Sequence, residues 1–89
     1  MAWRIEFDDA AKHDLAKMDK QQAKRITAFL RERVAVLDDP RSLGEALKGP
    51  KLGSFWRYRT GDYRIISHIE DGFLRILVVK IGNRREVYQ

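Results

Sequence analysis

Three strand-like segments occupy the C-terminal part of the chain, and two short connections separate them. The segments cover residues 54–60, 62–69 and 73–81. In the first two, apolar and polar side chains alternate with a period of two, and the third is an apolar run. The connections Thr60-Gly61-Asp62 and Glu70-Asp71-Gly72 have the length and residue types of hairpin turns. The chain is therefore predicted to form a sheet from three consecutive antiparallel strands.

The segment before these strands has the features of one further strand and two helices. Residues 3–7 alternate like a short strand, and Asp8 and Asp9 follow as N-cap and first-turn acid of a helix. A second helix is predicted over residues 21–37, ended by the proline after Asp38 and Asp39, and residues 40–53 are predicted to form a loop. The predicted fold is α+β with the order β-α-α-β-β-β, with two helices packed on one face of a small, mainly antiparallel sheet.

Length and composition limit the class of protein. The 89 residues, 44% of them hydrophobic, suffice for one domain, predicted to span residues 1–89. No apolar run approaches the ~18 residues of a membrane span and no signal peptide is evident, so a cytoplasmic protein is expected. The absence of cysteine excludes disulfides, thiolate zinc sites and a cysteine nucleophile. His13 and His68 are isolated and no glycine-rich phosphate loop precedes a helix, so no metal and no cofactor are expected.

The charge of the chain favours a polyanionic partner. The net charge is +5 at pH 7, and the isoelectric point is about 9.8. Residues 54–89 carry seven Lys/Arg, six of them Arg, against four Asp/Glu, whereas residues 1–53 carry 11 against 9. The positive excess is concentrated in the predicted sheet and the residues after it, where guanidiniums offer planar donors that match phosphate oxygens. A basic solvated surface without a ligand is the alternative interpretation.

Strand alternation predicts which side chains face the helices. The apolar bed for the helices is expected to consist of Trp56, Tyr58, Tyr63, Ile65 and Ile69. Arg57, Arg59 and Arg64 would then crowd together on the open face. Like charges opposite one another cost stability, so this grouping requires either a function or acidic partners such as Asp62 or Glu70.

A second group of polar side chains follows the last strand. The sequence Gly82-Asn83-Arg84-Arg85-Glu86-Val87-Tyr88 brings two guanidiniums and a phenol to the end of the apolar run. Guanidiniums bind phosphate, and a tyrosine hydroxyl can donate or accept a proton. Together with the arginines of the sheet, these side chains indicate RNA as the partner. We expect Arg57, Arg64, Arg84 and Tyr88 on one open face, opposite both helices.

The motifs, taken in order, resemble the RelE branch of the RelE/ParE toxin superfamily, the toxins of bacterial and archaeal toxin–antitoxin pairs. The resemblance covers essentially the whole chain and rests on Phe7-Asp8, Leu47-Lys48-Gly49, Trp56-Arg57-Tyr58-Arg59, Gly61-Asp62-Tyr63-Arg64-Ile65-Ile66 and the C-terminal motif. It implies a type II toxin that inhibits translation as a ribosome-dependent endoribonuclease cleaving mRNA in the ribosomal A site. It also implies three partners, namely the ribosome, mRNA and a cognate RelB-like antitoxin. An exposed basic surface suits an antitoxin with an acidic or amphipathic segment.

The resemblance also implies site residues. The positions that match the family's catalytic residues are Arg57, Arg64, Arg84 and Tyr88. The positions expected to contact RNA are Lys51, Arg59 and Arg85. Some members of the family carry lysines where this chain has Phe55 and Arg57, so a lysine base does not carry over at those positions.

The chemistry of these residues leaves the general base open. Cleavage by the RNA's own 2′-OH needs a base, charge stabilisation at the phosphorus and protonation of the 5′-oxygen. Arginine does not deprotonate, so the arginines are predicted to stabilise charge. Tyr88 is the titratable group among the matched positions, and a loop lysine, Lys48 or Lys51, is the alternative base.

Two other functions stay open. In the ParE branch the same fold poisons DNA gyrase by protein contact, without nuclease chemistry, and such an inhibitor has no need of Arg64, Arg84 and Tyr88 together. A non-catalytic RNA-binding module would account for the charge and would leave Tyr88 unexplained. Inducing the protein in cells separates these functions, because either translation or DNA replication stops first.

Overall fold

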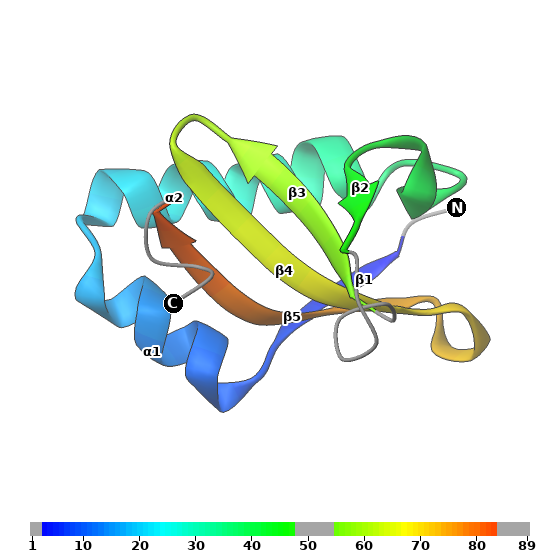
Figure 1. Ribbon diagram of the computed structural model, residues 1–89, viewed down its shortest axis with the longest axis horizontal. Coiled ribbons are helices and arrows are strands. Elements are labelled where there is room, and N and C mark those ends of the chain that lie inside the picture. Colours follow the sequence, from blue (N-terminus) through cyan, green and yellow to red (C-terminus); the bar gives the residue numbers. More distant parts are fainter. Residues whose placement is uncertain (1–2, 48–54, 84–89) are drawn as a thin grey trace.

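The computed structural model describes residues 3–47 and 55–83 and shows an α+β fold, with two helices packed against a five-stranded sheet (Figure 1). In chain order the elements are β1 (Arg4–Phe7), α1 (Asp9–Lys17), α2 (Lys20–Phe29), the π-helical turn η1 (Leu30–Val34), the 3₁₀ turn η2 (Pro40–Ser42), β2 (Glu45–Ala46), β3 (Trp56–Thr60), β4 (Tyr63–Glu70), the 3₁₀ turn η3 (Asp71–Phe73) and β5 (Arg75–Asn83). The predicted fold class is confirmed, and β2 is an additional strand. No helix within the described ranges is long and apolar enough to cross a membrane.

The sheet has the strand order β1-β5-β4-β3-β2. β3, β4 and β5 pair antiparallel in sequence, as their short connections predict, and β2 joins the outer edge of β3 antiparallel. β1 pairs parallel with β5, from Arg4 opposite Arg75 to Phe7 opposite Val78. In Figure 1, α2 crosses behind the sheet and the opposite face is turned to the viewer. We call this opposite face, which no described helix covers, the open face.

The helices bury the face of the sheet that alternation predicts. The side chains predicted to face the helices all lie in or against the main core: Trp56, Tyr58, Tyr63, Ile65 and Ile69. Tyr58 and Ile65 have no exposed surface. This part of the sequence prediction is confirmed.

The second helix ends earlier than predicted and changes its winding. It was expected over residues 21–37, but α2 ends at Phe29 and the chain continues as η1. Ile26, Leu30 and Val34, spaced by four, are all buried in the core. The i→i+5 bonding of a π turn widens the winding, which keeps residues spaced by four on the same side. Packing against the sheet thus decides the geometry of this segment.

A β-bulge in β5 decides which of its side chains reach the core. The pairing with β4 skips Val79. Val78 before the bulge and Ile81 after it both lie in the core under the helices, although strict alternation would place them on opposite faces. After the bulge, Gly82 lies directly opposite Arg64 of β4.

The segment predicted as a loop departs most from the prediction. Its described part, residues 40–47, contains η2 and β2. The buried Tyr58 hydroxyl donates to the Pro40 carbonyl at 2.7 Å, and Trp56 Nε1 donates to the Leu43 carbonyl at 2.7 Å. Both donors come from β3 and hold this segment along the edge of the sheet. The prediction of a loop was therefore wrong for Glu45 and Ala46, which pair with β3 as a strand, because long-range side-chain bonds hold this segment against β3.

Candidate functional site

Three arginines share the open face. Arg59 and Arg64 are directly opposite each other across β3 and β4, and Arg57 is opposite Ile66 on the same pair of strands. The intervening residue, Tyr58, points into the core on the other face. The predicted placement of Arg57, Arg59 and Arg64 away from the helices is therefore confirmed, while their roles stay predictions.

The direct pairing of two guanidiniums is the most informative feature of this face. Like charges directly opposite each other on a sheet are destabilising, and an anion bound between them removes that cost. Arg59 is exposed, and Lys80 of β5, also exposed, lies opposite Ile66. Lys80 was not nominated from the sequence, because its place on the open face depends on the bulge. The open face thus offers several cationic side chains to a polyanion.

A carboxylate accompanies these cations. Glu45 of β2 is directly opposite Arg57, and its Oε2 lies 2.9 Å from Arg57 Nη2. The Arg57 side chain is 17% exposed, whereas the Glu45 side chain is 59% exposed. The ion pair therefore leaves the carboxylate accessible from solvent beside a largely buried guanidinium. Sequence reasoning missed Glu45, because it falls in the segment predicted as a loop.

The two acids named from the sequence as alternative partners of these arginines, Asp62 and Glu70, lie in different places. Glu70 hydrogen-bonds to Arg75, which also contacts the Glu6 carboxylate at 3.2 Å. The hydrogen bond from Arg75 holds the pKa of Glu70 below its ordinary value. Asp62 lines a hollow with Arg59 and Arg64. Glu70 therefore pairs with Arg75 of β5 and not with Arg57, Arg59 or Arg64.

Two hollows flank Arg59 on the open face. The larger, of about 260 Å³, is lined by Leu43, Gly44, Glu45, Arg57 and Arg59. The smaller, of about 140 Å³, is lined by Arg59, Gly61, Asp62, Tyr63 and Arg64. Each hollow combines guanidinium donors with one carboxylate. The two hollows share Arg59, so a chain of linked phosphates can contact both.

An apolar platform lies beside the cationic part of the open face. Ile66 and Leu47 are buried there, and Phe55 packs against them. The rings of Phe55 and His68 stack in a tilted arrangement, with centroids 4.2 Å apart. His68 therefore packs against an aromatic ring. In the described part of the chain, no three His, Asp or Glu side chains gather to hold a metal ion.

The end of β5 is held next to Arg64. Asp14 Oδ2 of α1 accepts a hydrogen bond from the Ile81 backbone N–H at 2.9 Å, which ties the helix layer to this strand end. The described part of β5 ends at Asn83. The other residues proposed for the site from the sequence lie outside the described residues: Lys48, Lys51, Arg84, Arg85 and Tyr88.

The sequence matches one family model. Residues 5–88 match the family described as ParE toxin of type II toxin–antitoxin system, parDE. A comparison with curated proteins finds no match.

The fold is shared with several solved toxin structures. One chain of the toxin–antitoxin complex RelBE2 from Mycobacterium tuberculosis has a TM-score of 0.85 and 20% identity, covering 97% of this chain and 95% of that one. The isolated E. coli RelE toxin has a TM-score of 0.71 and 19% identity, covering 98% and 92%. The archaeal RelE–RelB complex from Pyrococcus horikoshii OT3 has a TM-score of 0.72 and 24% identity, covering 98% and 100%. At these identities the likeness establishes a common fold.

Proposed function

The chain belongs to the family of ParE toxins of type II toxin–antitoxin systems, and from this premise we propose that it is a ribosome-dependent endoribonuclease that cleaves mRNA in the ribosomal A site. The observation that carries the proposal is the direct opposition of Arg59 and Arg64 on a face without a covering helix, beside the Arg57–Glu45 pair. This arrangement suits a phosphate backbone and supplies a carboxylate that can accept a proton. The toxin would act in the cytoplasm.

The proposed chemistry is attack of the RNA's 2′-oxygen on the adjacent phosphorus. The base takes the 2′-OH proton, the 2′-oxygen bonds to phosphorus, and the bond to the 5′-oxygen breaks. A 2′,3′-cyclic phosphate remains, and the leaving 5′-oxygen receives a proton from an acid. Guanidiniums stabilise the charge that develops on the phosphoryl oxygens. Arg57 and Arg64 are assigned this role, together with Arg84, which follows the described end of β5 directly.

We assign the base to Glu45. It is the accessible carboxylate beside Arg57, and a carboxylate accepts a proton as a guanidinium does not. Tyr88 is then the acid that protonates the 5′-oxygen, and Lys51, Arg59 and Arg85 contact the RNA backbone. The Glu45 carboxylate forms an ion pair with Arg57, so the 2′-OH of the substrate must compete with Arg57 for this carboxylate. Positioning of mRNA by the ribosome supplies the required alignment, which makes free RNA a poor substrate.

A cognate RelB-like antitoxin is the second proposed partner. The solved M. tuberculosis structure is a toxin–antitoxin complex, and the P. horikoshii structure is a complex of RelE with RelB. In this chain the cationic open face favours an antitoxin segment that brings acidic side chains. Such a segment would block RNA and neutralise the toxin at the same time.

The test is single-turnover cleavage of mRNA on programmed ribosomes, with free RNA in parallel. Wild-type protein should cleave only with ribosomes present and should leave a 2′,3′-cyclic phosphate. Glu45→Gln and Tyr88→Phe should each slow cleavage by about 10²-fold or more, the scale of losing a general base or acid. Glu32→Gln removes an exposed acid from η1 and serves as the control. Absence of ribosome-dependent cleavage by the wild type would refute the function, and full activity of Glu45→Gln would return the base to Tyr88 or a loop lysine.

Inhibition of DNA gyrase is the second candidate, because the matching family model is described by ParE. Gyrase supercoiling assays with purified toxin test it directly. Loss of supercoiling with intact mRNA on ribosomes would favour this candidate over the nuclease.

A further inference from the structure

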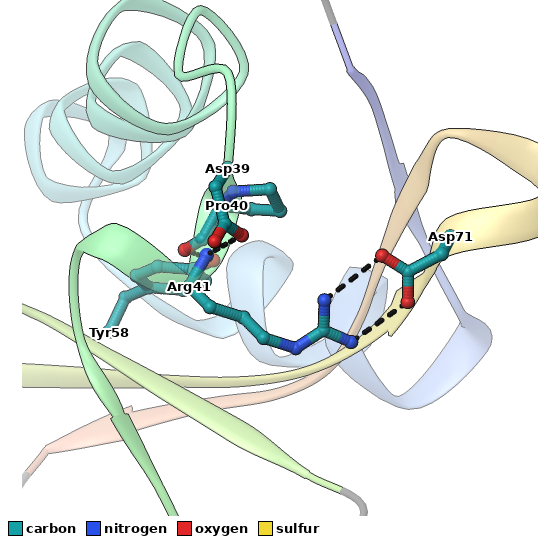
Figure 2. A network of polar contacts seen from close by, with 5 residues as sticks. All are labelled: Asp39, Pro40, Arg41, Tyr58 and Asp71. Atoms are coloured by element: carbon teal, nitrogen blue, oxygen red, sulfur yellow. Dashed lines mark hydrogen bonds and ion pairs between the residues drawn. The ribbon is translucent and has the colours of Figure 1, made fainter.

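We infer that the Arg41–Asp71 pair positions Glu45, although Arg41 lies at the opposite end of the 40–47 segment from Glu45. This inference rests on the proposed function, in which Glu45 is the base. Figure 2 shows the network: Arg41 of η2 forms two parallel hydrogen bonds to the carboxylate of Asp71 in η3, each 2.9 Å long. A bidentate guanidinium–carboxylate pair fixes both distance and orientation. It ties the start of the 40–47 segment to the connection between β4 and β5.

The same segment is anchored to β3 at two further points. Tyr58 binds the Pro40 carbonyl, as Figure 2 also shows, and Trp56 binds the Leu43 carbonyl. Asp39 Oδ1 accepts the backbone N–H of Arg41 at 2.9 Å, which caps η2 in the orientation that aims Arg41 at Asp71. The pair with Asp71 is therefore one of several attachments that set the course of the backbone toward Gly44.

Local support for Glu45 comes from its short strand and from the Leu47 N–H, which donates to the Phe55 carbonyl at 3.1 Å. β2 consists of Glu45 and Ala46 alone, and each forms a single ladder pair with β3. Gly44 precedes it with a φ of +84°, where the chain turns against the β3 backbone. A two-residue strand depends on both flanking segments for its register, so the direction in which the chain arrives from η2 helps to set where the Glu45 carboxylate meets Arg57. The Arg41 anchor lies four residues before Glu45 along this path.

Exposure separates this positioning role from a role in stability. The Arg41 and Asp71 side chains are 41% and 64% exposed. Exposed ion pairs change global stability little, whereas a misplacement of about 1 Å in a catalytic group can reduce the rate by up to 10²-fold. Breaking the pair is thus expected to change turnover more than folding.

The first experiment measures cleavage on programmed ribosomes. Arg41→Gln and Asp71→Asn should each lower kcat by about 5- to 10-fold, with an unchanged KM for ribosomes and a melting temperature within a few degrees of wild type. The exchanged pair, Arg41→Asp with Asp71→Arg, should recover most of the loss. Arg33→Gln, which removes an exposed arginine from η1, controls for the change in net charge. Equal kcat values for wild type and Arg41→Gln would overturn the inference.

A second readout does not depend on activity. In ¹H–¹⁵N spectra of the toxin, the Arg57 side-chain Nε–H resonance reports its ion pair, and Glu45→Gln shows how far loss of that pair moves it. Arg41→Gln and Asp71→Asn should move the resonance in the same direction, and Arg33→Gln should not. A resonance that stays in place in both variants overturns the positioning role. If the wild-type protein does not cleave mRNA but the Arg57 resonance moves as expected in the variants, the proposed function is refuted and the positioning role is not.

Discussion

Gly44 should be the glycine whose substitution damages this protein most among those with positive φ in the described ranges. A Cβ at Gly44 would lie 2.4 Å from the Arg57 carbonyl oxygen and 2.8 Å from Trp56 Nε1, at a φ of +84°. Gly61 also has a positive φ, +57°, but a Cβ there meets nothing within 4 Å. Gly61→Ala is therefore a matched control that changes the backbone preference without a clash.

The expected magnitudes follow from these contacts. A left-handed backbone costs an alanine ~1–2 kcal/mol, and ~0.4–1 kcal/mol of this is offset by the less flexible unfolded chain. Gly61→Ala should thus lower the free energy of unfolding by about 1 kcal/mol. Gly44→Ala adds overpacking against the β3 backbone, which costs ~1–3 kcal/mol, for a total of roughly 2–4 kcal/mol.

Thermal and urea unfolding measure both variants. At ~4–8 °C per kcal/mol for a domain of this size, Gly44→Ala should melt at least about 8 °C below wild type, and Gly61→Ala about 4–8 °C below. Cleavage on ribosomes should fall in Gly44→Ala beyond the loss of folded protein, because β2 carries Glu45. Equal destabilisation by the two variants would show that Gly44 does not approach β3 in solution, which would refute the reasoning.

Three further predictions concern the Tyr58–Pro40 and Asp14–Ile81 hydrogen bonds. Tyr58→Phe leaves the buried Pro40 carbonyl without its donor and should lower the free energy of unfolding in urea by ~1–3 kcal/mol. An unfolding free energy equal to that of the wild type would contradict the hydrogen bond. Burial raises the pKa of the Tyr58 hydroxyl in the folded protein. Above pH ~10 the unfolded chain therefore loses this proton before the folded one does, so the free energy of unfolding falls as the pH rises. This fall should be smaller in Tyr58→Phe. Asp14→Ala removes the acceptor of the Ile81 N–H and should cost ~1–2 kcal/mol, with faster amide exchange at Ile81. Unchanged exchange there would mean that α1 does not hold the end of β5.

Local signals account for the parts of the fold that the sequence predicted well. Asp8 caps α1 through the Ala11 N–H at 2.9 Å, as its position before the apolar repeat indicates. Gly61 turns β3 into β4 with a φ of +57°. Period-two alternation placed Tyr58 under the helices and Arg57 on the open face. Each of these features depends on residues within a few positions of one another, so periodicity and residue type reveal them.

The site was predicted in part. Arg57, Arg59 and Arg64 were found on one face because alternation assigns faces, but the acid beside them was not found. Glu45 is 12 residues from Arg57 in the sequence, and the two meet only when β2 joins the edge of β3. No local pattern marks a two-residue strand, since its order comes from the side chains of β3 that bind the preceding carbonyls.

Patterns in the amino-acid sequence were enough to predict the class of fold, the hairpin order of β3, β4 and β5, the faces of β3 and β4 and the cationic character of the open face. Three features depend on the packed fold, namely the bulge at Val79, the parallel pairing of β1 with β5 and the ion pair of Glu45 with Arg57. The physical reason is the range of the interactions. Caps, turns and strand periodicity are energies of neighbouring residues, whereas these three features arise from contacts between segments that only the packed sheet brings together.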